Sequence, residues 1–95
     1  MGGVPEVYKI LFIEKMPKNV KQETLEDIFG DYNGFVEVRL IAEKGYAFVE
    51  YISDDYASYA LQDVKAADTL KFEDPDTGLK VDVRINFSKR ARDWK

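Results

Sequence analysis

The fold of this 95-residue chain is decided by the stretch Lys44-Gly45-Tyr46-Ala47-Phe48-Val49-Glu50-Tyr51. Glycine at position 45 favours a turn, and the residues after it are mostly aromatic or β-branched types, which favour a strand. Alternate residues of a strand point to opposite faces of its sheet. One face would carry Ala47, Val49 and Tyr51, and the other Tyr46, Phe48 and Glu50. We therefore expect a strand over 46–52 with aromatic side chains on both faces.

The segments on either side of this strand alternate between strand and helix patterns. Residues 35–41 alternate with a period of two and would pair with 46–52 as a hairpin, since Gly45 marks the turn between them. Residues 7–13 are rich in β-formers and end before Pro17, and residues 80–87 follow a turn at 74–78. Apolar residues recur at helical spacing within 20–31 and over 54–66, where Ser53 can cap the helix.

The order of these elements is β-α-β-β-α-β, which predicts an α+β fold. It is the ferredoxin-like sandwich, a four-stranded antiparallel sheet with two helices on one face. Because both helices cover the same side, the other side of the sheet faces solvent and should be polar.

Side-chain alternation divides the sheet residues between these two faces. The helix-facing set is Leu11, Ile13, Val36, Val38, Leu40, Ala47, Val49, Tyr51, Val83, Ile85 and Phe87. The open-face set is Ile10, Phe12, Glu14, Glu37, Arg39, Tyr46, Phe48, Glu50, Arg84 and Asn86. Three aromatic residues, Phe12, Tyr46 and Phe48, therefore lie on the face that should be polar. The residues that flank them are Arg39, Lys44, Arg84 and Asn86.

Exposed aromatic rings among cations suit single-stranded RNA, whose unstacked bases gain roughly 1–3 kcal/mol each on a ring. The same surface could instead be covered by a C-terminal helix or by a protein partner, since exposed apolar patches mark partners of either kind. From the residue pattern alone both interpretations stay open, with RNA favoured.

The composition excludes several other classes of protein. With no cysteine and no histidine, the chain offers no disulfide, no thiolate or imidazole metal site and no histidine base. The acidic turn at 74–78 lacks the later ligands of a calcium loop. Glu14, Glu37 and Glu50 share a flat face that cannot desolvate a carboxyl, so we expect no enzyme, no cofactor and no metal. The chain contains no run of about 18 apolar residues, so its sequence predicts no membrane span.

The formal charge of −4 argues at first against a polyanionic partner. The charge is uneven, however. Residues 21–53 carry −4 and residues 54–76 carry −5, whereas residues 1–20 carry +1 and residues 77–95 carry +4. Much of the acid falls in predicted helices and turns away from the aromatic face. We expect RNA contacts that are dominated by stacking, with few phosphates neutralised.

The octapeptide at 44–51 resembles the RNA recognition motif signature K/R-G-F/Y-G/A-F-V-x-F/Y at every position. Residues 11–16 resemble the companion hexapeptide, whose aromatic second position is Phe12. Lys15 stands where that family usually has Asn, and Met16 where it has Leu. The resemblance implies an RNA-binding domain over 7–89 with the fold expected above.

Within that family the chain most resembles the C-terminal RNA recognition motif of the spliceosomal ribonucleoprotein A / B-double-prime family. The run Gly34-Phe35-Val36-Glu37-Val38-Arg39-Leu40 carries most of this similarity. It implies a nuclear protein of a pre-mRNA splicing small nuclear ribonucleoprotein, with RNA and other splicing proteins as partners. In that family the C-terminal copy is the poorer RNA binder, so a protein-interaction module is the alternative.

The resemblance also implies roles for individual residues. Phe12 and Tyr46 or Phe48 would stack on successive bases or riboses, Lys44 would contact a phosphate, and Asn86 would read a base edge. Main-chain groups around Ser88 and Lys89 would read further bases.

The two ends of the chain are expected to lie outside the domain. Residues 1–6 form an N-terminal tail or an expression remnant, and residues 90–95 form a basic tail that contains Trp94. This tail could extend the RNA groove, serve as a nuclear-import patch, fold Trp94 over the aromatic face, or fray.

Overall fold

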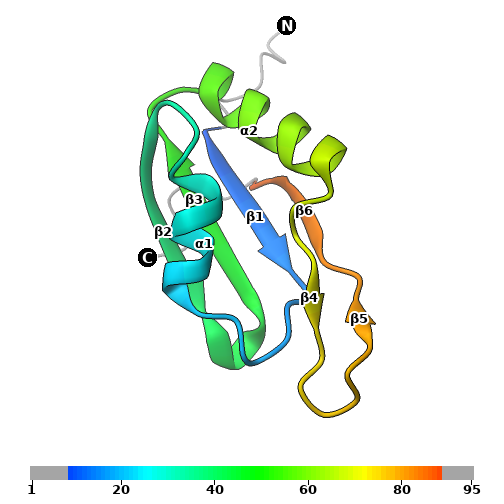
Figure 1. The fold of residues 1–95 in the computed structure, drawn as a ribbon. Helices are drawn as coiled ribbons and strands as arrows, with labels where there is room; N and C mark the ends of the chain where they lie inside the picture. Colours follow the sequence, from blue (N-terminus) through cyan, green and yellow to red (C-terminus); the bar gives the residue numbers. More distant parts are fainter. Residues whose placement is uncertain (1–8, 89–95) are drawn as a thin grey trace, which may run out of the picture.

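Residues 9–88, which the computed structural model describes, form a four-stranded antiparallel sheet with two helices on one face (Figure 1). The strands are β1 (Ile10–Glu14), β2 (Phe35–Ile41), β3 (Tyr46–Tyr51) and β6 (Arg84–Phe87), in the spatial order β2-β3-β1-β6. The helices are α1 (Gln22–Phe29) and α2 (Asp54–Ala67). The ferredoxin-like fold expected from the sequence is confirmed.

The β2–β3 hairpin closes through a short 3₁₀ helix, η1 (Ala42–Lys44), and Gly45. Gly45 has φ of 74°, and a side chain there would bring its Cβ within 2.9 Å of the Met16 carbonyl oxygen. At the other end of the hairpin a bulge lies between Phe35 and Glu37. The extra residue leaves Val36 46% exposed, and Phe35 packs against the core instead. The assignment of Val36 to the helix-facing set was wrong because strict alternation does not anticipate a bulge.

The single strand predicted over 80–87 is divided in the structure. Its first part is β5 (Lys80–Val81), which pairs with β4 (Phe72–Glu73) in a separate two-stranded ribbon. Its second part is β6, which pairs with β1. The apolar alternation runs through both parts, so the pattern carries no sign of the change of partner.

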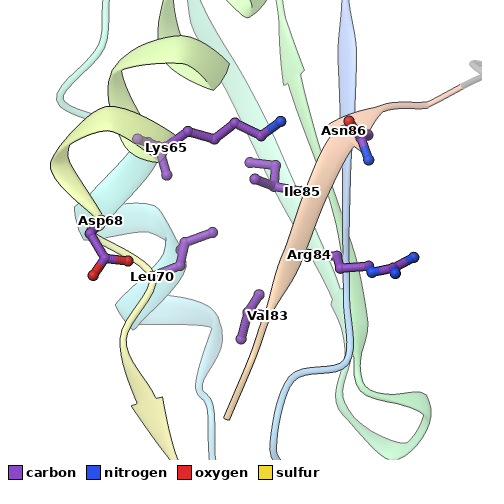
Figure 2. Close-up of a pocket in the computed structure, with 8 residues that line it drawn as sticks. Lys65, Asp68, Leu70, Val83, Arg84, Ile85 and Asn86 are labelled. Carbon is purple, nitrogen blue, oxygen red and sulfur yellow. The ribbon is translucent and has the colours of Figure 1, made fainter. Parts of the chain in front are cut away.

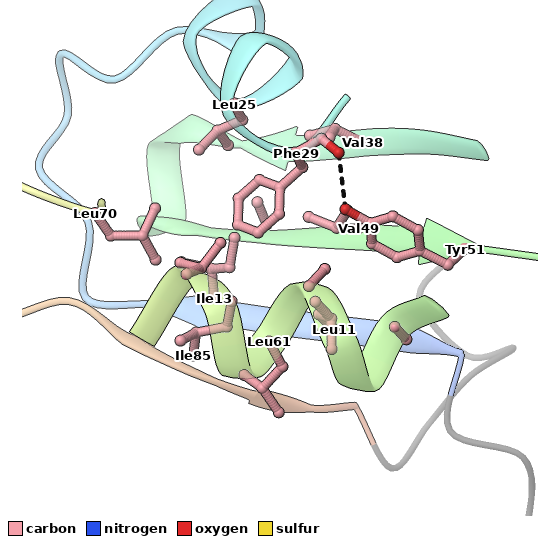
Figure 3. Close-up of a cluster of buried hydrophobic side chains, with 14 of the residues drawn as sticks. Leu11, Ile13, Leu25, Phe29, Val38, Val49, Tyr51, Leu61, Leu70 and Ile85 are labelled. Atoms are coloured by element: carbon pink, nitrogen blue, oxygen red, sulfur yellow. Dashed lines mark hydrogen bonds between the residues drawn. The ribbon is translucent and has the colours of Figure 1, made fainter. Parts of the chain in front are cut away.

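The core lies between the helices and the sheet (Figure 3). From the central strands it takes Leu11, Ile13, Ala47, Val49 and Tyr51, and from the helices Leu25, Phe29, Ala57, Ala60, Leu61 and Val64. Tyr51 is fully buried, and its hydroxyl donates a hydrogen bond of 2.8 Å to the carbonyl oxygen of Phe29. This bond joins the last residue of α1 to β3. The Tyr51 hydroxyl therefore has a hydrogen-bond partner although the residue is fully buried.

Gln22, the first residue of α1, is bonded to the outer edge of the sheet. Its side-chain amide donates to the carbonyl of Val38 at 2.7 Å and accepts from the N–H of Leu40 at 3.2 Å. β2 is an edge strand, so these two backbone groups have no strand beyond them. The amide thus satisfies part of the edge in the way that a neighbouring strand would.

The chain leaves β1 through a left-handed residue. Lys15 has φ of 67°, and the next residue, Met16, donates its N–H to the carbonyl of Gly45 at 2.9 Å. This bond joins the end of β1 to the turn that precedes β3. A left-handed conformation costs an ordinary residue roughly 1–2 kcal/mol, whereas Asn adopts it more readily. The resemblance already pointed to position 15, where Asn is usual, and the backbone gives a physical reason for that preference.

Removing the Tyr51 hydroxyl should lower the free energy of unfolding by about 1 kcal/mol. The cost is no larger because the Phe29 carbonyl also accepts the N–H of Tyr32 at 3.2 Å. Urea unfolding of Tyr51→Phe measures it. Tyr46→Phe is the control, since the Tyr46 hydroxyl makes no hydrogen bond within residues 9–88, and equal losses in both variants would contradict the prediction.

Stability should also fall at alkaline pH through two tyrosines. Burial raises the pKa of Tyr51 well above its ordinary value, and burial together with the hydrogen bond to Asp63 raises the pKa of Tyr32 to about 12. The unfolded chain loses these protons near pH 10 while the folded chain keeps them, so stability is full below pH 10 and declines above it. Unfolding free energies measured from pH 8 to 11 should decline less in Tyr51→Phe than in the parent chain.

Replacing Lys15 by Asn should raise the unfolding free energy by up to about 1 kcal/mol, because Asn relieves the left-handed strain. Lys18→Asn removes the same charge from an exposed lysine whose φ is not positive. Thermal or urea unfolding of the two variants should therefore differ. A gain of the same size in Lys18→Asn would show that charge, rather than backbone strain, is responsible.

Candidate nucleic-acid interface

The three predicted aromatic residues come together on the open face of the sheet. Phe12 of β1 lies directly opposite Phe48 of β3, and their ring centroids are 5.2 Å apart. Tyr46 lies 5.5 Å from Phe12 and 5.8 Å from Phe48, so the rings form a triangle. We call Phe12, Tyr46 and Phe48 the aromatic platform. All three are half-buried, and none belongs to the core between sheet and helices.

The strand register extends the platform into a row across all four strands. Arg39 of β2 pairs with Phe48, Phe48 pairs with Phe12, and Phe12 pairs with Asn86 of β6. Arg39 and Asn86 are both exposed, so a cation and an amide stand at the two ends of the row. The amide can donate to and accept from a base edge, and the guanidinium suits a phosphate or a base.

A second row of residues passes through Tyr46, nearer to the β2–β3 turn than the first row. Arg84 of β6 pairs with Glu14 of β1, and Ile41 of β2 pairs with Tyr46. Lys44 is exposed and lies two residues before Tyr46, where the left-handed Gly45 turns the chain into β3. Lys44 and Arg84 therefore supply two positive charges on this side of the platform, where Glu14 is the one carboxylate among the strand residues just named. Neither forms an ion pair with another residue of 9–88.

The opposite end of the open face is acidic. Glu37 of β2 pairs directly with Glu50 of β3, and Glu50 also pairs with Ile10. Like charges that face each other across strands are unfavourable, and they repel a phosphate. Ile10 is on this face by register, as the sequence indicated, but is only 2% exposed. A bound nucleic acid would thus keep its phosphates near Arg39, Lys44 and Arg84 and away from Glu37 and Glu50.

Two further sequence predictions concern the end of β6. Ser88 is buried, and its N–H donates to the carbonyl of Ile10 at 2.7 Å, so that main-chain donor is already used. Lys89, the eighth predicted site residue, lies outside the described residues, as do Trp94 and the basic tail.

A cavity of about 320 Å³ lies beside β6 (Figure 2). It is lined by Val64, Lys65, Asp68 and Leu70 from the end of α2 and the following chain, and by Val83, Arg84, Ile85 and Asn86. Sequence reasoning did not find it, because it forms where α2 and β6 meet, far apart along the chain. None of the three platform residues lines this cavity.

A metal site and a membrane span are two further features to consider in the described residues. Within residues 9–88 no group of three or more acidic side chains is arranged to hold a metal ion. No helix in this range is long and apolar enough to cross a membrane.

Comparisons with known proteins address the family directly. The model of the RNA recognition motif family matches residues 11–73. U2 small nuclear ribonucleoprotein B″ of Arabidopsis thaliana is 46% identical over 54 residues, which cover 56% of this chain and 23% of that protein. U1 small nuclear ribonucleoprotein usp102 of Schizosaccharomyces pombe is 42% identical over 87 residues, which cover 87% of this chain and 30% of that protein. The chain thus spans about a quarter to a third of these relatives.

Solved structures show the same arrangement. The C-terminal RRM domain of MEC-8, solved bound to AGCACA, has a TM-score of 0.64 and 28% identity, and covers 85% of this chain and 90% of that one. The RNA-binding domain of a methenyltetrahydrofolate synthetase domain-containing protein has a TM-score of 0.71 at 14% identity, over 98% of this chain and 88% of that one, and so shows the fold alone. By the family match and by its relatives among the spliceosomal ribonucleoproteins, this chain belongs to the RNA recognition motif family.

Proposed function

We propose that this chain is a non-catalytic module that binds single-stranded RNA by stacking bases on Phe12, Tyr46 and Phe48. The observation that carries the proposal is the triangle of three rings on the solvent side of the sheet, at centroid distances of 5.2–5.8 Å. Three rings in contact on a face that could be polar are a cost in water unless a ligand covers them. Flat bases cover such rings regardless of sequence.

The surrounding polar groups would position the RNA rather than supply most of the affinity. In this proposal Lys44 contacts a phosphate, Arg39 and Arg84 hold the backbone, and Asn86 reads a base edge. Main-chain groups near Lys89 would add base contacts. Three cations share the face with three carboxylates, so little net charge attracts the RNA, and stacking supplies most of the binding free energy.

The names of the relatives support a proposed biological setting. Because the relatives are named U1 and U2 small nuclear ribonucleoproteins, we place this module in the nucleus, within a pre-mRNA splicing ribonucleoprotein. Its RNA would be a small nuclear RNA or a pre-mRNA, with other splicing proteins nearby. Residues 7–89 would form the module and the two ends would be tails. The MEC-8 domain, which was solved with AGCACA, supports a short single-stranded ligand.

Replacing Phe48 by Ala should weaken binding of a random-sequence octanucleotide RNA by roughly 1–3 kcal/mol, about 5- to 150-fold, because one stacking ring is lost. Fluorescence anisotropy at low salt measures the affinity. Phe48→Tyr keeps the ring and should bind like the parent chain. Leu79→Ala is the surface control, since Leu79 is 68% exposed and lies between β4 and β5, outside the sheet. If the parent chain bound no octanucleotide, the proposed function would be wrong.

The salt dependence of the same affinity should be shallow. Single-stranded contacts give a slope of about −0.7 per phosphate in a plot of log affinity against log salt, so two or three contacts predict roughly −1.4 to −2.1. Lys44→Gln removes one phosphate contact and should make the slope shallower by about 0.7, whereas Phe48→Ala should leave the slope unchanged. A slope steeper than about −4 would mean that phosphate contacts, rather than stacking, dominate.

A further inference from the structure

The layer opposite the platform carries a one-sided charge. Residues 22–34 and 54–64, which contain α1, the loop after it and most of α2, include no lysine or arginine. Their carboxylates are Glu23, Glu26, Asp27, Asp31, Asp54, Asp55 and Asp63. The first base after them on α2 is Lys65. This layer therefore repels nucleic acid and attracts cations.

Within this acidic layer, aromatic and apolar side chains from α2 and from the chain just before it lie against the loop that follows α1. Figure 1 shows that α1 and α2 lie on the same face of the sheet. Tyr59 is 63% exposed and its ring lies edge-on to that of Tyr32, at a centroid distance of 6.0 Å. Tyr56 is 40% exposed, and its ring lies so close to Gly34 that a Cβ there would come within 2.5 Å of it. Ile52 is 61% exposed, and its N–H donates to the Gly34 carbonyl at 2.8 Å.

Tyr56 and Tyr59 lie three residues apart on α2 and so share one side of that helix, which brings the two sets of contacts together. We call Tyr32, Ile52, Tyr56 and Tyr59 the tyrosine surface. The platform does not include any of these residues, and of the four only Tyr32 also packs against the core. Asp63 accepts the Tyr32 hydroxyl at 2.7 Å, and Asp54 and Asp55 occupy the first turn of the helix that carries Tyr56 and Tyr59. Exposed rings are thus bordered by carboxylates, with no lysine or arginine in the same segments.

We propose that the tyrosine surface is a docking site for an arginine-containing segment of a partner protein. A guanidinium stacks on a tyrosine ring, binds a carboxylate with paired hydrogen bonds, and gives up water more easily than an ammonium does. The tyrosine surface offers a guanidinium both a ring to stack on and carboxylates to accept its hydrogen bonds.

The negative charge of this layer argues against a second copy of the chain, a nucleic acid or a lipid surface as the occupant. Two copies that met through this surface in a symmetric dimer would bring the same carboxylates face to face. Nucleic acid and anionic lipid surfaces carry the same sign as the layer. The chain's own Arg90 and Arg92 carry the right chemistry, and the experiment separates them from a partner.

Two nonapeptides test the proposal, Gly-(Arg-Gly)₄ and Gly-(Lys-Gly)₄, which carry the same charge. Titrated into the full chain at low salt and followed by NMR, the arginine peptide should shift the resonances of Ile52, Tyr56 and Tyr59. It should bind about 2- to 5-fold more tightly than the lysine peptide, the range expected for stacking at an exposed ring.

Variants locate the binding on this surface. Tyr59→Ala should weaken the arginine peptide about 2- to 5-fold, Tyr59→Phe should not, and Leu79→Ala, an equally exposed control, should have no effect. Asp55→Asn should weaken both peptides more than Asp76→Asn, which removes an acid from the β4–β5 loop. RNA affinity should stay unchanged in Tyr59→Ala because the platform is on the other face.

Three results would overturn the proposal. Equal affinities for the two peptides, with no effect of Tyr59→Ala, would mean that only the diffuse acidic field attracts them. Sedimentation that shows a dimer lost in Tyr59→Ala would make the surface a contact between copies. Nuclear Overhauser contacts between Arg90 or Arg92 and the Tyr59 ring in the free chain would assign the surface to the chain's own tail.

Discussion

The pairing of β1 with β3 is the constraint on which the rest of this structure depends. Phe12 faces Phe48, and the neighbouring pair Leu11 and Val49 faces the helices. A shift of one residue would exchange the two faces, burying the rings and exposing the core. The apolar core therefore fixes the register, and the register places the platform. The hydrogen bond from Met16 to Gly45 holds the same two strands together where the chain leaves β1.

Regular periodicity explains which parts could be predicted from the sequence. The two-residue period of β1 and β3 and the helical spacing of Leu25 and Phe29 locate the core and the three rings without coordinates. The features that the sequence does not predict depend on local departures from this periodicity or on contacts between residues that are distant along the chain. The bulge at Val36 breaks the period, and the apolar pattern of 80–87 continues while the chain changes its pairing partner. The cavity beside β6 and the contact of Tyr56 with Gly34 join segments that are distant in the chain.

The two faces of the molecule divide the charges of the chain between them. On the sheet side, Arg39, Lys44 and Arg84 surround the rings, Glu14 lies opposite Arg84, and Glu37 and Glu50 lie together at one end. On the helix side, acids stand alone from residue 54 to residue 64. The net charge of −4 is thus an average over surfaces with different chemistry, and it predicts the partner of neither. The distribution of charge between the two faces is more informative than the net charge. The acidic helix layer would repel an approaching polyanion, which would therefore meet the sheet face first.

The Gln22 amide has a consequence for crowding. It occupies the outward carbonyl of Val38 and the outward N–H of Leu40, the backbone groups that a foreign strand would need in order to extend the sheet beyond β2. A bare strand edge at high local concentration is a template for aggregation. One glutamine on a helix therefore covers part of the exposed edge of β2 without using any residue of the face that carries the rings.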